Sequence, residues 1–312
     1  MRAPRPRPSR ARFALGVLVL LGGLAACGSA GAVDTSGKLR VIATTTQVAD
    51  FARQVGGDRA VVTGLLHPNV DPHDFEPSPA DLTAINRAAV VVENGVGLEH
   101  WLDGALSSAG YSGPVVDTSG GIRLRANPEG GSAQDPHIWQ DPRNAKLMVA
   151  TIRDAFVAAD PTDAAAYRAN ADRYLGQLNA LDAEVAREIA SIPPANRRVV
   201  TDHDAFGYFF DRYGLTFVGS VIPTFDTSAE LSGSALADLV AKIRAQHVPA
   251  VFAEASLPPR TAQTVAAEAG VRVIAGDGAL YGDTLGPAGS PGATYLGMVA
   301  YNTRTFVAGL RG

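Results

Sequence analysis

The chain of 312 residues contains only one cysteine, Cys27. A single thiol cannot form an internal disulfide, so the protein must be held together by a buried apolar core. No tract after residue 26 is long enough and apolar enough to cross a bilayer as a helix. A phosphate-binding loop is also missing, because the only Gly-Lys pair, Gly37-Lys38, is followed by leucine. These absences exclude a disulfide-stapled scaffold, a membrane-spanning body and a nucleotide hydrolase of the phosphate-loop type.

The chain is also poor in basic residues. It has 27 Lys and Arg against 31 Asp and Glu, for a net charge of −4. Five of the arginines fall within residues 1–26, so removal of that segment would leave a net charge of −9. An acidic surface of this kind argues against a nucleic-acid partner and against membrane attachment through basic side chains.

The N-terminal segment has the pattern of a secretory signal. Residues 1–26 combine five arginines, no acidic residue and the apolar run Phe13–Leu24, which is too short for a stable membrane span. The sequence Leu24-Ala25-Ala26-Cys27 resembles the lipobox of bacterial lipoproteins, which implies cleavage before Cys27 and lipidation of its sulfur. The alternative is an ordinary signal peptide with a chance cysteine. Residues 27–37 have the composition of a flexible tether, so we expect an extracytoplasmic protein anchored by lipid to the outer face of the cytoplasmic membrane.

From residue 38 onward, short apolar strands alternate with amphipathic helices. This alternation predicts parallel sheets covered on both faces, in an N-terminal α/β lobe over residues 38–160 and a C-terminal α/β lobe over residues 193–312. The predicted strands lie at 39–43, 60–66, 89–93, 113–117, 197–202, 215–221, 249–254 and 271–275, and the predicted helices at 47–55, 79–87, 204–213, 233–246, 259–269 and 292–309.

A long helix over residues 161–192 is predicted to join the two Rossmann-like lobes. Asp160-Pro161 is typical of an N-cap followed by proline at the first helical position. The following apolar residues recur at helical spacing and define one face: Tyr167, Tyr174, Leu178, Leu181, Val185 and Ile189. Two shorter helices with a kink at Gly176 are the alternative. A single rigid connector would allow only a small opening motion between the lobes.

Four separate segments each offer one metal ligand. They are His73 and His137, each in an Asp-Pro-His tripeptide, His203 in Asp202-His203-Asp204, and Asp283 in Tyr281-Gly282-Asp283. The separations of 64, 66 and 80 residues exclude a local finger, so the ligands must come from different loops. Three imidazoles and a carboxylate suit zinc, and loops that follow parallel strands form the crevice where α/β sheets bind ligands. The sequence therefore predicts one divalent-metal site between the two lobes, with His203 at the end of a strand and the start of a helix.

The same segments resemble those of a known family. The stretches VDPHDFEPSPADL, DPHIWQDPRN, TDHDAFGYFFDRYGL and LYGDTLGPAGSPGATYLGMVAYNTRTFVAGL are similar to the periplasmic solute-binding proteins of cluster A-I, which serve zinc and manganese ABC transporters. This resemblance implies two lobes joined by one long helix, the ligands His73, His137, His203 and Asp283, and an ABC permease with its cytoplasmic ATPase as partners. The resemblance also implies a difference in the third ligand. Members dedicated to manganese have a glutamate at that position, where this chain has His203. Zinc is therefore favoured, with manganese as the alternative.

Other functions remain open at this stage. An exported zinc hydrolase is disfavoured, because four protein ligands close the metal shell and the His-Glu-x-x-His pattern is missing. A surface adhesin and a metal chaperone are compatible with the resemblance. Glu254, at the end of a strand, could support a ligand from behind or act as a cap. Three other histidines, His67, His100 and His247, are expected to face solvent. We expect a monomer.

Overall fold

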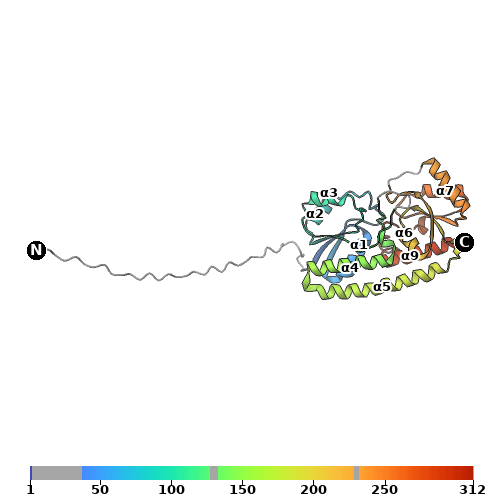
Figure 1. Ribbon diagram of the computed structural model, residues 1–312. Helices are drawn as coiled ribbons and strands as arrows, with labels where there is room; N and C mark the ends of the chain where they lie inside the picture. The colour runs from blue at the N-terminus through green and yellow to red at the C-terminus, as the bar shows by residue number, and fades with distance from the viewer. Residues whose placement is uncertain (2–36, 127–132, 228–231, 312) are drawn as a thin grey trace. The chain divides into compact units, whose positions relative to one another are not determined.

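The computed structural model describes Met1 and residues 37–126, 133–227 and 232–311. The predicted signal, Cys27 and most of the predicted tether lie outside this range. Two α/β lobes are present, each built on a four-stranded parallel sheet (Figure 1). The strand orders, β2-β1-β3-β4 and β6-β5-β7-β8, are equivalent. The predicted fold class is confirmed, whereas the predicted domain limits remain predictions.

The first lobe is formed by buried, valine-rich strands and the helices that cover them. Its elements are β1 (Leu39–Ala43), α1 (Thr46–Gly56), β2 (Ala60–Gly64), α2 (Pro79–Asn86), β3 (Val90–Glu93), α3 (Leu102–Ala109), β4 (Val115–Asp117) and α4 (Pro142–Ala159). Helix α2 begins where Ser78 and Asp81 form a capping box, and α4 begins where Asp141 caps the chain ahead of Pro142. Helices α3 and α4 are additions to the elements expected from the sequence.

The second lobe repeats this scheme. Its elements are β5 (Arg198–His203), α6 (Gly207–Tyr213), β6 (Thr216–Ile222), α7 (Gly233–Ala245), β7 (Ala250–Phe252), α8 (Arg260–Ala269), β8 (Arg272–Ile274) and α9 (Tyr295–Leu310). The predicted helix start at residue 204 is wrong. His203 is instead the last residue of β5, where it pairs with Ile222, and α6 begins only at Gly207.

Helix α5 (Ala164–Ala190) connects the lobes. It has 27 residues, a length of about 40 Å, and it packs against α1 and α4 of the first lobe and α6 and α9 of the second (Figure 1). It continues through Gly176 as one helix, and the six residues of the predicted apolar face are all buried. Its N-terminus differs from the prediction, because Pro161–Asp163 form a 3-10 turn and Asp160 instead accepts a hydrogen bond from the hydroxyl of Tyr167 at 2.9 Å.

Helix α1 and the start of α9 form a second, buried junction between the lobes. The ring of Phe51 lies 4.7 Å from that of Tyr295, measured between centroids. The carboxylate of Asp50 accepts a hydrogen bond of 2.9 Å from the backbone N–H of Tyr295, and burial raises the pKa of this carboxyl. Residues of both lobes therefore belong to one apolar core.

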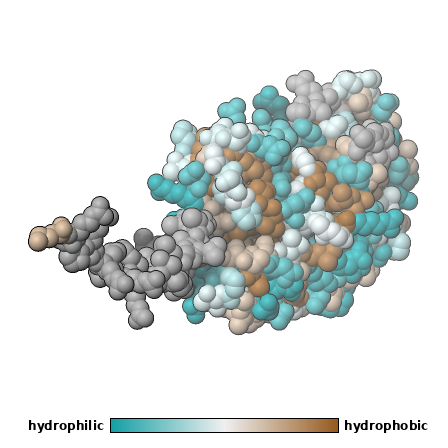
Figure 2. All heavy atoms as spheres, turned by 60° about the vertical axis from the view of Figure 1, so that its left-hand side comes forward, coloured by the Kyte–Doolittle hydropathy of each residue, from teal (hydrophilic) through white to brown (hydrophobic). Residues whose placement is uncertain are grey.

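Hydrophilic residues cover most of the face shown in Figure 2, and hydrophobic residues form smaller patches among them. Within residues 37–126, 133–227 and 232–311, none of the helices has both the length and the apolar character that a membrane span requires.

Candidate metal centre

The structure brings the four predicted residues together at the carboxyl ends of the two sheets. His73 lies in the loop between β2 and α2, His137 just before α4, His203 at the end of β5, and Asp283 in the loop before α9. One ligand atom from each lies within 4.8 Å of the others, and all four side chains are buried. Two lobes thus contribute two residues each.

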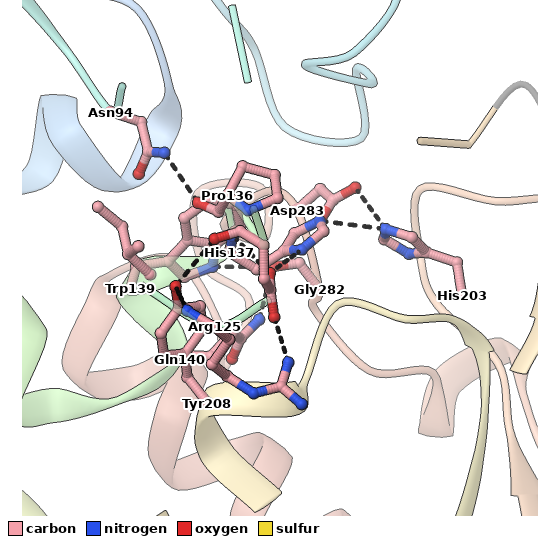
Figure 3. Close-up of polar contacts among 12 residues, drawn as sticks. Asn94, Arg125, Pro136, His137, Trp139, Gln140, His203, Tyr208, Gly282 and Asp283 are labelled. Carbon is pink, nitrogen blue, oxygen red and sulfur yellow. Dashed lines mark hydrogen bonds and ion pairs between the residues drawn. The ribbon is translucent and has the colours of Figure 1, made fainter. Parts of the chain in front are cut away.

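All three imidazoles turn Nε2 toward the carboxylate of Asp283. Its Oδ1 lies 3.4 Å from Nε2 of His137, and its Oδ2 lies 3.5 Å from Nε2 of His73 and 3.6 Å from Nε2 of His203. The Nε2 atoms of His137 and His203 are 3.2 Å apart (Figure 3). A tetrahedral zinc site with metal–ligand distances of about 2.0–2.2 Å has ligand-to-ligand separations of about 3.3–3.6 Å. The four separations of 3.2–3.6 Å are close to this spacing, and the whole set of ligand atoms lies within 4.8 Å, so the group could hold one small cation.

Unsatisfied polar atoms also point to a missing charge at this position. Nε2 of His73 and Oδ1 of Asp283 are buried, and neither has a hydrogen-bond partner among the described residues. Buried polar atoms are normally paired. A divalent cation among the four side chains would satisfy both atoms.

Two buried carboxylates hold the histidines from behind. Oδ1 of Asp135 lies 2.8 Å from Nδ1 of His137, and Oε1 of Glu254 lies 2.9 Å from Nδ1 of His203. When Nδ1–H donates to a carboxylate, the Nε2 lone pair is left free for a metal and the ring is fixed in orientation. Of the two roles considered for Glu254, the structure favours support of His203.

Gly282 is required by this packing. A Cβ atom at residue 282 would lie 1.7 Å from Oε2 of Glu254. The carbonyl of Gly282 also accepts hydrogen bonds from Nε1 of Trp139 at 3.1 Å and from Nε2 of Gln140 at 3.0 Å (Figure 3). Trp139 is fully buried, and its ring centroid lies 5.4 Å from that of His137, so it is both a core residue and a wall of the site.

The electrostatics of the site favour a bound positive charge. Burial by itself lowers the pKa of His203, but the carboxylates of Asp283 and Glu254 raise it to about 10. Burial likewise opposes the charge on Asp283, yet the three surrounding histidines hold the pKa of this carboxyl below its usual range. The carboxylates of Asp283 and Glu254 therefore favour a positive charge at this position.

The remaining histidines are not in the site. His67, His100 and His247 are exposed, as expected. His100 lies in a turn ahead of α3. The role of Asp135 in supporting His137 was not assigned from the sequence. The position of Asp135 two residues before His137, matched by Asp71 two residues before His73, could have indicated this role.

These features define a two-lobed α/β protein that binds a cation between its lobes. Residues 41–309 match the family described as "ZnuA: Zinc-uptake complex component A periplasmic", and the chain belongs to this family. It is 34% identical over 298 residues to the manganese-binding lipoprotein MntA of Bacillus subtilis, covering 92% of this chain and 95% of that one. It is 31% identical over 280 residues to the iron-binding protein YfeA of Yersinia pestis, covering 88% of each.

Solved structures support the same family assignment. The periplasmic zinc binding protein TroA of Treponema pallidum superimposes with a TM-score of 0.82 at 30% identity, covering 88% of this chain and 100% of that chain. Family membership makes this protein a metal-binding component of an ABC transporter, and not an enzyme. The relatives are named for manganese, iron and zinc, so the family alone does not select the metal.

The support of His203 can be tested by replacing Glu254 with glutamine, which keeps the shape of the side chain and removes its charge. We expect zinc affinity to fall by about tenfold, at the lower end of the effects seen when such partners are changed. Competition with a chromophoric chelator would measure the change. Glu268→Gln, at an exposed position of α8, is the matched control, and an equal affinity for Glu254→Gln and wild type would contradict the assigned role.

Proposed function

We propose that this protein captures Zn²⁺ outside the cytoplasmic membrane and delivers it to an ABC permease powered by a cytoplasmic ATPase. In this proposal His73, His137, His203 and Asp283 coordinate the ion. The observation that carries the proposal is the convergence of three imidazoles and one buried carboxylate, whose ligand atoms lie within 4.8 Å of one another. Family membership supports the transport role.

The choice of zinc rests on the ligand set. Neutral imidazoles suit zinc, whereas carboxylate, carbonyl and water oxygens suit manganese. Manganese remains the second candidate, because relatives named as manganese-binding cover nearly the whole chain. Zinc will outcompete manganese in solution by the Irving–Williams order whatever the physiological cargo, so affinity by itself does not decide between them.

Two experiments together test the cargo. Metal analysis of protein purified without added salts should find zinc at close to one ion per chain. Cells that lack the gene should then recover growth on added zinc. Recovery on manganese but not on zinc would overturn the zinc assignment and leave the four-residue site standing.

We also propose that Cys27 carries a lipid that holds the protein at the outer face of the membrane. The support is the lipobox pattern in the sequence and the naming of several relatives as lipoproteins. In the Cys27→Ser variant we expect an unprocessed precursor or a freely soluble form. Detergent-phase partitioning and the mass of the protein would measure this, and a variant that partitions like wild type with an unchanged mass would exclude the anchor.

A further inference from the structure

The two Asp-Pro-His tripeptides share one construction. Oδ1 of Asp71 accepts a hydrogen bond of 2.8 Å from the backbone N–H of His73. Oδ1 of Asp135 accepts a hydrogen bond of 2.9 Å from the backbone N–H of His137. Each aspartate thereby closes a turn over its proline and fixes where the following histidine stands.

The second oxygen of each aspartate is linked to the other lobe. Oδ2 of Asp71 accepts a hydrogen bond from the hydroxyl of Thr227, which follows β6. Oδ2 of Asp135 pairs with Nη1 of Arg125, and Nε of the same arginine binds Oδ2 of Asp211 in α6 at 2.7 Å. Both carboxylates therefore connect a histidine of the first lobe to a residue of the second.

The arginine bridge is closely fitted. A Cβ atom at Gly207, the first residue of α6, would lie 1.7 Å from Nη1 of Arg125. The hydroxyl of Tyr208 accepts a hydrogen bond from the backbone N–H of Arg125 at 3.1 Å and donates one to the carbonyl of Asp135 at 2.9 Å (Figure 3). Asp135 is fully buried, and Arg125 is the only cation other than histidine paired with it among the described residues.

We propose that Asp71 and Asp135 are positioning residues that couple closure of the lobes to retention of the cation. This inference rests on the proposed metal-binding function. Movement of the second lobe away from the first would break the bonds to Thr227 and Asp211 and release the restraint on both aspartates. The two histidines that they orient would then lose their geometry while His203 and Asp283 move away.

A small movement is sufficient for this coupling. Metal sites require their ligands to be held within about 0.5 Å of the productive geometry. The lobes are also joined by α5, by the buried contact between α1 and α9, and by the hydrogen bonds of Trp139 and Gln140 to the carbonyl of Gly282, so a large separation of the lobes is not needed. Asp71 and Asp135 each contact a turn that carries a metal ligand and are each linked to the second lobe. A small separation of the lobes would therefore displace the ligands and release the metal.

The test uses the partners in the second lobe, which lie outside the metal site. Thr227→Val and Asp211→Asn, alone and combined, would be loaded with zinc, and dissociation would be followed by stopped-flow mixing with excess chelator. We expect each change to accelerate dissociation by roughly two- to tenfold, as for loss of one hydrogen bond, and the two effects to multiply. Association rates and the Tm of the metal-free protein should stay at wild-type values. The conservative variants Thr227→Ser and Asp211→Glu keep the bonding groups, so they should release zinc as slowly as the wild-type protein.

Asp154→Asn is the matched control. Asp154 is 70% exposed and its Oδ1 lies 2.9 Å from Nε of Arg153, against 68% exposure and 2.7 Å for the pair of Asp211 with Arg125. Wild-type dissociation rates in Thr227→Val and Asp211→Asn, or an equal acceleration in Asp154→Asn, would overturn the coupling. Failure of the wild-type protein to retain zinc would instead overturn the proposed function.

Discussion

Replacing His203 by alanine should weaken zinc binding by more than roughly 100-fold. Loss of a residue that only hydrogen-bonds to a metal ligand already weakens binding by roughly 10- to 100-fold. The reason is that His203 would lose a direct bond to the ion, and its Nε2 lies 3.2 Å from that of His137 and 3.6 Å from Oδ2 of Asp283. Competition with chelators of graded affinity would measure the change. His247→Ala, at an exposed histidine after α7, should bind zinc like wild type.

The alanine variant also removes a buried ring that faces two carboxylates, so its stability must be measured separately. Glu254 and Asp283 would then face each other without the imidazole between them. His203→Gln keeps a polar side chain of similar size and provides the second variant. If both variants fold, judged by circular dichroism and the Tm of the metal-free protein, and still bind zinc within tenfold of wild type, His203 is not a ligand.

The site could be predicted from the sequence because its residues are chemically distinctive and each follows a strand or stands beside a proline. Two Asp-Pro-His tripeptides and an isolated histidine after a valine-rich strand leave few structural explanations. The partners Arg125 and Asp211 could not be found in this way. They are 86 residues apart, and their 2.7 Å contact exists only because α6 packs beside the loop after β4.

The fold class could also be predicted from the sequence, but the start of one helix was wrong and helix α4 was missed. The strand and helix alternation predicts two parallel sheets, but His203 was expected to follow its strand and to begin a helix. Pairing of His203 with Ile222 includes this residue in β5, so its ring stands at the end of the strand as expected, whereas the helix begins only at Gly207. Helix α4 was missed, although Asp141 and Pro142 form a recognisable helix start and its buried residues recur at helical spacing.

Zinc binding should release protons, and its affinity should fall as the pH is lowered. With a pKa raised to about 10, the ring of His203 is mostly protonated at pH 8 before the metal binds. The metal needs the neutral imidazole, so each ion bound at pH 8 should displace about one proton. Affinity should then decrease about tenfold for each pH unit between pH 9 and 7.

Calorimetry in buffers of different ionisation enthalpy would count the protons released. At saturating zinc, His203→Gln should release about one proton fewer than wild type at pH 8, since the ring that held it is gone, whereas His247→Ala should match wild type. Release of no proton by the wild-type protein at pH 8 would show that His203 is already neutral. In that case the carboxylates of Asp283 and Glu254 do not charge the ring before the metal arrives, and competition between proton and cation would not set the affinity of this site.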